Sequence, residues 1–181
     1  FEKILFQGCN LSGQDFRGVK FSQVNAAQAD FKGADFTDAD LGYSTFMEAD
    51  LSGAKLSRVR ARNALFKGAI LNGADFSGAD LSQAYFGDCD AGGADFSGAT
   101  LVNSLFNGAR CAAAVFKGAR CFYADFSHAD LTAADFGEAD LYAAKLHRII
   151  EEHTNWNNAN RLLVKSTDPE MEEAEEWRPP V

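Results

Sequence analysis

The sequence lacks the segments that direct a protein into or across a membrane. No run of apolar residues is long enough to span a bilayer, and no stretch has the pattern of a signal peptide. The sequence therefore predicts neither secretion nor membrane spanning, and we expect a cytoplasmic protein without a membrane partner.

The sequence also lacks the residue patterns that carry catalysis. It contains three His and four Cys, and none of them has the spacing of a metal site or of a nucleophile with its base. No glycine-rich phosphate-binding loop is present either. We expect a protein that is not an enzyme and that needs neither a cofactor nor a metal ion.

The chain has fewer basic than acidic residues. The chain has 17 Lys and Arg against 26 Asp and Glu, which gives a formal net charge of −9. Proteins that bind nucleic acid through its phosphates neutralise them with Lys and Arg. We therefore do not expect this chain to bind nucleic acid directly.

What the sequence does contain is a repeat of five residues. Every fifth residue from Phe6 to Leu146 is apolar, and we call these 29 residues the core positions: 14 are Phe, 10 Leu, 3 Ala and 2 Cys. The residue two before each core position is Ala in 20 cases. An internal repeat as regular as this decides the architecture before any local propensity does.

A period of five fits neither standard element, since an α-helix advances about 100° per residue and the side chains of a flat strand alternate between its faces. It fits a chain that turns a corner once in every repeat. The two residues after each core position are rich in Ser and Gly, which favour turns. A regular corner would wind the chain into a solenoid with Phe, Leu and Ala inside.

The repeats resemble those of a known family. Ala-Asp-Phe-Ser-Gly at 74–78 and 94–98, Ala-Asp-Leu-Ser-Gln at 79–83 and Ala-Asp-Leu-Thr-Ala at 129–133 are similar to the A(D/N)LXX motif of pentapeptide-repeat proteins. The resemblance covers roughly residues 1–146. It implies an all-β fold, a right-handed quadrilateral parallel β-helix (solenoid) with four pentapeptides per coil, and so about seven coils. We place this β-helix at residues 1–160 and a C-terminal tail with a short capping helix at 161–181.

The four cysteines belong to the same pattern. Cys111 and Cys121 occupy core positions, and Cys9 and Cys89 replace the Ala two residues before one. We expect all four to face inward as small apolar core residues, rather than to bind metal or form disulfides.

One outward-facing set of residues is unusually apolar. All four Tyr, and the only Phe outside the five-residue register, would lie along one edge of a solenoid with 20 residues per coil. With three aliphatic neighbours they form a set that we call the aromatic edge: Tyr43, Leu65, Tyr85, Val102, Leu105, Phe122, Tyr123 and Tyr142. Contiguous exposed apolar residues mark interaction sites, and Tyr is frequent at interface hot spots. We interpret the edge as a protein-binding or dimerisation surface; the alternatives are an aromatic stack that only stiffens the edge, or cover by the C-terminal tail.

A second outward-facing set is acidic and would occupy two neighbouring columns: Asp30, Asp35, Asp50, Asp75, Asp90, Asp95, Asp130 and Asp135. In the family that the repeats resemble, a quinolone-resistance subset presents such faces as a mimic of duplex DNA and binds a type II topoisomerase (gyrase). The alternative is that Asp at this position is only the family consensus. Arg58, Arg60 and Arg62 interrupt the acidic pattern with positive charge.

The repeat fades after Leu146. The register places one further core position at Trp156, and Ser166–Glu170 has the pattern of a helix start, with a proline in the first turn. Met171 and Trp177 would then share one apolar stripe. We expect a short helix that closes the end of the solenoid, or a dimerisation element built from Trp156, Met171 and Trp177.

Two of the three histidines fall close together in this register. His128 and His147 would lie on adjacent coils, near one another. The repeat places no Cys or carboxylate triad beside them, so we expect both to be exposed to solvent rather than to bind a metal ion.

These observations predict a non-catalytic protein-binding or scaffold module whose partner the sequence does not name and which could form a homodimer. The first alternative is the acidic DNA mimic directed at a type II topoisomerase. The second is a repeat domain of a larger secretion-system or effector protein, because the sequence starts in register without Met.

Overall fold

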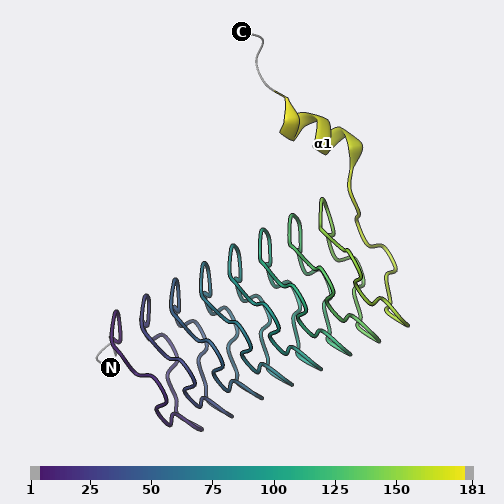
Figure 1. Cartoon of the computed structure of the whole chain (residues 1–181). Coiled ribbons are helices and arrows are strands. Elements are labelled where there is room, and N and C mark those ends of the chain that lie inside the picture. Colours follow the sequence, from purple (N-terminus) through teal and green to yellow (C-terminus); the bar gives the residue numbers. More distant parts are fainter. Residues whose placement is uncertain (1–4, 178–181) are drawn as a thin grey trace.

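The computed structural model describes residues 5–177, apart from the side chains of Glu170 and Met171. The chain forms one stack of coils, with a short helix near its C-terminal end (Figure 1). Residues 20 apart pair through parallel β-bridges, from Leu5 with Asn25 to Lys145 with Lys165. Because a bridge falls at every fifth residue, each coil has four sides of five residues. The solenoid that the repeat predicts is confirmed.

The stack is longer than the sequence suggested. The bridges continue to Lys165, so residues 5–165 form eight coils rather than about seven, and the coils extend five residues past the predicted boundary at 160. The core positions of the last coil include Glu151 and Arg161, both exposed. Charge is tolerated there because the last coil has a neighbouring coil on one side only. Because these two core positions are charged, the repeat could not be recognised in this part of the sequence.

The sides of the coils are too short to form strands. Between residues 5 and 177, each side pairs through a single isolated bridge, and the only regular element is the helix α1 (Pro169–Glu176). Two of every five residues are used for the turn, which leaves no room for a longer strand. The β-helical part of the all-β prediction therefore holds, but extended strands are absent from the described residues.

Each corner is turned by a residue with positive φ. The backbone N–H that follows it bonds to the core-position carbonyl, as from Cys9 to Phe6 (2.9 Å). All 32 corner residues from Gly8 to Leu163 have φ between 50° and 69°, and twelve of them are Gly. The other twenty, among them Tyr43 and Tyr123, adopt a conformation that costs an L-residue about 1–2 kcal/mol.

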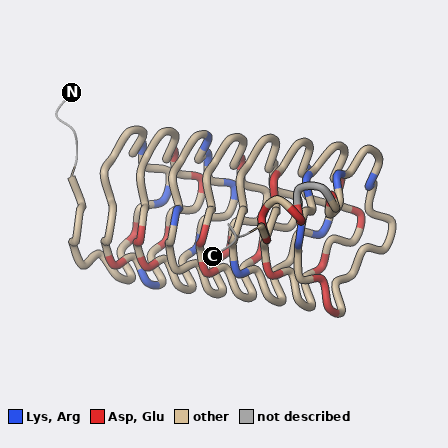
Figure 2. The backbone as a smooth tube through the Cα atoms, turned by 90° about the horizontal axis from the view of Figure 1, so that it is seen from above, with Lys and Arg blue, Asp and Glu red and all other residues tan. Residues whose placement is uncertain are grey.

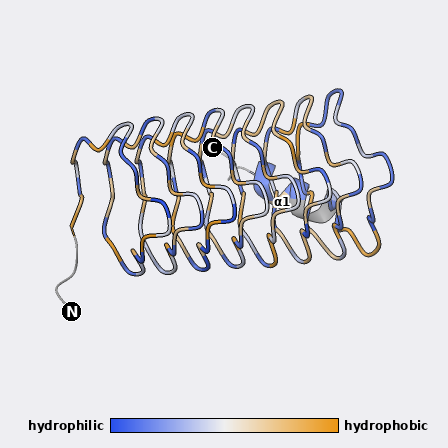
Figure 3. Cartoon of the chain, turned by 90° about the horizontal axis from the view of Figure 1, so that it is seen from below, coloured by the Kyte–Doolittle hydropathy of each residue, from blue (hydrophilic) through white to orange (hydrophobic). Residues whose placement is uncertain are grey.

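The core consists of two facing ladders of Phe rings. Within each ladder, rings of successive coils stack 4.5–5.3 Å apart; one ladder contains Phe46, Phe66, Phe86, Phe106 and Phe126, and the other contains Phe76, Phe96, Phe116 and Phe136. Rings of opposite ladders meet edge to face, such as Phe86 and Phe96 at 86°, the geometry that aromatic pairs favour. Hydrophobic and hydrophilic segments alternate along most of the coils in Figure 3, as the five-residue repeat requires.

Three of the four cysteines lie in this core. Cys89, Cys111 and Cys121 are fully buried, and all four thiols are free. Burial raises the pKa of the Cys89 thiol to about 12. The prediction that all four are buried was wrong for Cys9, which is exposed because the first coil has a neighbour on one side only.

The helix α1 lies along a side of the stack and not across its end (Figures 1 and 2). It starts beside His147, whose Nδ1 accepts the backbone N–H of Asp168, and its Glu175 reaches His128, one coil nearer the N-terminus. Trp177 is 67% exposed. The predicted helix exists, but its contacts are with one corner of the coils, so it does not close the end.

A stacked aromatic ring closes the last coil instead. Trp156 is half-buried and packs against the core, and the Arg161 guanidinium lies 4.6 Å from its ring centroid. The side chain of Met171, which the sequence assigned to the same cap, is outside the described residues. Among the residues that the structure covers, no helix has the length and apolar character to cross a membrane.

Candidate functional site

Three residues of the predicted aromatic edge occupy the same corner in consecutive coils. Val102, Phe122 and Tyr142 follow one another there, and backbone N–H groups of Asn103 and Tyr123 bond to the carbonyls of Phe122 and Tyr142 (2.9 and 3.0 Å). The rings of Tyr123 and Tyr142 meet edge to face with centroids 5.9 Å apart. The structure thus places these residues together at one corner, as the 20-residue register requires.

The same corner continues into the last coil with two residues that sequence reasoning missed. The backbone N–H of Ala143 bonds to the carbonyl of Leu162 (2.9 Å), and Leu162 and Leu163 are each 61% exposed. They occupy the positions of Tyr142 and Ala143 one coil later, so extending the 20-residue register past residue 160 would have found them. We call Val102, Phe122, Tyr123, Tyr142, Leu162 and Leu163 the C-terminal aromatic corner.

Three further predicted residues form a neighbouring strip on the adjoining side. Leu65, Tyr85 and Leu105 pair through consecutive bridges. The Tyr85 ring is half-buried and folds over Gly87, where a Cβ would lie only 2.3 Å from the ring. Its ring therefore leans toward the next corner and contributes less free surface than its sequence position suggested.

Tyr43 is separate from the rest of the aromatic edge. It is 66% exposed, but its neighbours at the same corner are Gln23 and Asn63, to whose coils it is joined by the backbone ladder. Polar residues continue at this corner through Gln83 and Asn103. The structure thus does not place Tyr43 in a continuous apolar surface, and the eight predicted residues do not form one edge.

The C-terminal aromatic corner is not covered by the tail in the part of the chain that the structure describes. The contacts of α1 are with His128, His147 and Arg148, which belong to another corner of the coils. Tyr123 remains 54% exposed. Beside it, the Arg120 guanidinium lies 5.3 Å from the centroid of Phe122, which adds a cation–π contact at the rim.

Most Asp residues of the acidic set form hydrogen bonds within the turns. In seven of its eight members the Oδ1 atom accepts the backbone N–H two residues later, at 2.7–3.0 Å: Asp30, Asp35, Asp50, Asp75, Asp95, Asp130 and Asp135. Asp90 pairs with Arg110 (3.2 Å). A side-chain acceptor at this position satisfies an amide that the turn would leave unpaired, so each Asp has a structural role.

The two acidic columns are also interrupted. Ile70 and Arg110 stand in one column, and Lys55 and Val115 in the other. Lys32 and Lys55 form ion pairs with Asp50 and Asp35. Basic and acidic residues are interspersed along the stack in Figure 2, so the acidic columns are not free of positive charge.

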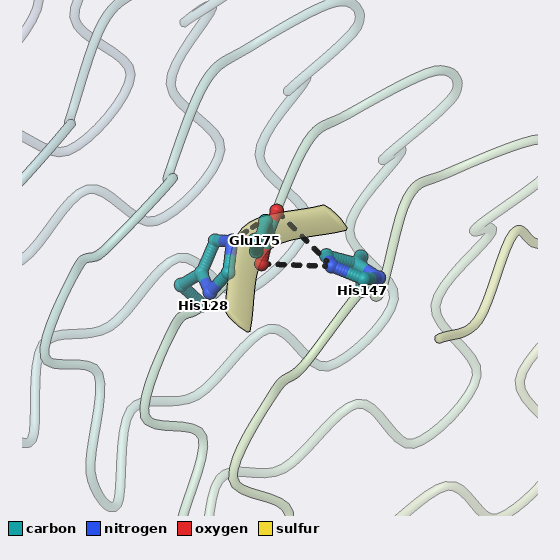
Figure 4. Close-up of side chains that lie close together, drawn as sticks. All are labelled: His128, His147 and Glu175. Atoms are coloured by element: carbon teal, nitrogen blue, oxygen red, sulfur yellow. Dashed lines mark hydrogen bonds and ion pairs between the residues drawn. The ribbon is translucent and has the colours of Figure 1, made fainter. Parts of the chain in front are cut away.

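A cluster of titratable side chains joins α1 to the coils. The carboxylate of Glu175 lies between two imidazole rings (Figure 4), with its Oε1 3.6 Å from Nε2 of His128 and 3.4 Å from Nε2 of His147. His147 is only 5% exposed, because α1 covers it. The prediction that both His are exposed was therefore wrong for His147, and the repeat could not place Glu175, which lies beyond the coils.

Arg148 extends this cluster. Its guanidinium lies 3.2 Å from Glu175 and 2.9 Å from Glu176, and its Nε is 3.9 Å from Glu172. Burial opposes the ionisation of Glu175, but hydrogen bonds from Arg148 and His147 outweigh it and lower the pKa of this carboxyl below its usual value.

Parallel bridges every fifth residue, corners with positive φ and two Phe ladders define a β-helical repeat protein. Two family models described as pentapeptide repeats match the sequence, one of nine copies at residues 6–55 and one of eight copies at 44–83, 79–110, 94–121 and 109–148. The chain belongs to the pentapeptide-repeat family. No curated protein sequence matched it.

Solved structures of the same family show the same fold. HetL, a pentapeptide-repeat protein involved in heterocyst differentiation regulation from the cyanobacterium Nostoc sp. strain PCC 7120, is 20% identical with a TM-score of 0.69, over 88% of this chain and 90% of HetL. A trypsin-treated form of QnrB1, a plasmid-mediated fluoroquinolone resistance protein, is 18% identical with a TM-score of 0.55, over 98% of both chains.

Proposed function

We propose that this chain is a non-catalytic module that binds a protein partner through the C-terminal aromatic corner. The observation that supports the proposal is the contrast within one corner of the stack. In the middle coils the residues with positive φ at this corner are Asn63, Gln83 and Asn103, whereas the last three coils have Tyr123, Ala143 and Leu163. The fold therefore has no need of large apolar side chains there.

Backbone conformation strengthens this contrast. Tyr123 and Leu163 have φ of 58° and 57°, a region that bulky residues rarely occupy, and both are more than half exposed. Neither side chain gains core burial in return for the unfavourable conformation. Rigid aromatic rings with neighbouring leucines suit a protein interface.

Site-specific photo-crosslinking tests this proposal. A photoreactive phenylalanine analogue replaces Tyr123 in one variant and Tyr43 in the matched control, which has the same φ and similar exposure but polar neighbours. We expect a discrete crosslinked product from position 123. An excess of unlabelled wild-type protein should prevent its formation, whereas an excess of the Tyr123→Glu/Leu163→Glu variant should not. Equal products from both positions would refute the proposal. A product of two linked copies would identify the partner as a second copy of this chain.

A second candidate is the acidic DNA mimic that binds a type II topoisomerase. It is favoured by the net charge of −9 and by Asp residues in two adjoining columns. The turn hydrogen bonds of these Asp residues and the interruptions by Lys55 and Arg110 count against it. A DNA-supercoiling assay with purified gyrase decides: inhibition or protection at micromolar protein supports the mimic, and no effect removes it.

A further inference from the structure

We propose that His128, His147 and Glu175 form a binding site for a divalent transition-metal ion of the Zn²⁺ type, which ties α1 to the last two coils. The three side chains come from three different segments: the corner of one coil, the corner of the next, and the helix. The site lies at a different corner from the aromatic one, so the inference is independent of the proposed function.

The distances fit a tetrahedral ion. With bonds of about 2.0–2.1 Å from Zn²⁺ to His nitrogen and carboxylate oxygen, the ligand atoms of a tetrahedron lie about 3.3–3.4 Å apart. Oε1 of Glu175 is 3.4 Å from Nε2 of His147 and 3.6 Å from Nε2 of His128, and all three ligand atoms lie within 4.8 Å of one another. The His128 side chain is 46% exposed and has room to close the remaining distance.

The chemistry of the ligands selects the kind of ion. Two imidazoles and one carboxylate are ligands of Zn²⁺ and related ions, which fill the fourth position with water. Ca²⁺ and Mg²⁺ bind oxygen ligands, and this cluster offers them a single carboxylate. We therefore expect Zn²⁺, Ni²⁺ or Co²⁺ to bind and Mg²⁺ and Ca²⁺ to bind at most weakly.

The surrounding charges favour a divalent cation. Three glutamates of α1 surround the single guanidinium of Arg148: Glu172, Glu175 and Glu176. This leaves two formal negative charges. Arg148 lies 3.2 Å from Oε2 of Glu175, which is also 3.4 Å from Nε2 of His147. The other oxygen, Oε1, faces both histidines, and the contact of Arg148 with this carboxylate is to Oε2, so Oε1 is the oxygen that we assign to the ion.

The hydrogen bond at the far side of His147 gives the proposal a spectroscopic signature. Nδ1 of His147 accepts the backbone N–H of Asp168 at 3.4 Å, which places the ring proton of the neutral form on Nε2. An ion bound at Nε2 moves that proton to Nδ1, because a neutral metal-bound imidazole keeps its proton on the other nitrogen. The contact with Asp168 must then rearrange.

Calorimetric titration of the full chain with ZnCl₂ at neutral pH tests the site. A Cys9→Ser background removes the exposed thiol, which could bind Zn²⁺ itself. We expect one site per chain, and we expect His128→Ala, His147→Ala or Glu175→Gln to weaken it at least about 100-fold, since even loss of a supporting hydrogen bond costs 10–100-fold in metal proteins. His153→Ala is the matched control, because His153 is exposed in the last coil at another corner.

Two further readouts separate metal binding from a structural role of the same residues. Zn²⁺ should switch the His147 tautomer in ¹⁵N NMR spectra, and it should slow amide exchange in 169–176 in the wild type but not in His128→Ala. The latter variant removes an exposed side chain, so the coils should stay folded. Absence of binding, equal binding by Glu175→Gln, or loss of binding in His153→Ala would overturn the proposal.

Discussion

The indole of Trp156 stacks on the ring of Phe136, with centroids 4.7 Å apart and an angle of 23° between the rings. Trp156 thereby adds a fifth ring to the ladder that begins at Phe76. The next core position, Arg161, places its guanidinium over the indole. The C-terminal end of the core is thus closed by an aromatic ring and a cation, without any help from α1.

This arrangement predicts a graded loss of stability along the ladder. Phe106→Ala removes a fully buried ring and should lower the free energy of unfolding by about 3–5 kcal/mol. Trp156→Ala removes a half-buried ring at the end, so we expect about 2 kcal/mol, less than the range for full burial. Urea unfolding followed by circular dichroism measures both. A larger loss for Trp156→Ala would show that the end governs the stability of the whole stack.

The thiols should divide into one reactive group and three inert ones. Cys9 is exposed, whereas burial raises the pKa of the other three thiols, that of Cys89 to about 12. The thiolate is the reactive form, so Ellman's reagent at pH 8 should titrate one thiol per native chain and four in denaturant. Cys9→Ser should abolish the native reaction. A second fast thiol in the native protein would contradict the burial of the core cysteines.

The repeat made the core predictable from the sequence, whereas the two ends of the stack could not be predicted from it. Phe106 and Ala109 could be placed from sequence because each coil presents the same environment to the same register position. Cys9 follows the register too, but it is exposed because its coil has a neighbouring coil on one side only. The register of a single residue does not show whether its coil lies at the end of the stack. Glu151 and Arg161 broke the apolar pattern for the same reason.

The candidate sites differ in the same way. Phe122 and Tyr142 were placed together because the 20-residue period fixes which residues share a corner. The cluster at Glu175 could not be predicted, because its position depends on how α1 folds back along the stack, and no repeat governs residues after Lys165. Tyr85 was placed on the correct side, but the direction of its ring depends on the space above Gly87.

The stack should lose stability in acid through carboxylates such as Asp80. Burial opposes ionisation of Asp80, but hydrogen bonds from Ser82 and the guanidinium of Arg62 outweigh it and lower the pKa below 3.8. Because the pKa is lower in the folded state, the ionised form of Asp80 stabilises the fold at pH values above 3.8. This contribution falls as the pH drops below 3.8 and is lost as the pH passes through the folded-state pKa. Asp80→Asn should flatten the acid limb of a plot of unfolding free energy against pH between about 2 and 5; an unchanged slope would contradict the assignment.

The corners should discriminate between side chains by backbone conformation alone. At Gly53, φ is +62° and a Cβ would meet nothing within 4 Å, so the Cβ that Gly53→Val adds has free space. We expect it to cost about 1–2 kcal/mol because a β-branched residue is strained at positive φ. Gly53→Asn is the control and should cost less, since Asn tolerates this region. Thermal unfolding measures the difference, and equal losses would show that the turn is not the cause.

The central claim, that the C-terminal aromatic corner binds a protein, is tested most directly by the affinity of the partner identified by crosslinking. Surface plasmon resonance would compare the wild type, the Tyr123→Glu/Leu163→Glu variant and the Tyr43→Glu variant against that partner. We predict at least about tenfold weaker binding for the double variant, as for residues at an interface hot spot, with Tyr43→Glu equal to the wild type. Unchanged affinity of the double variant, or an equal loss with Tyr43→Glu, would contradict the account.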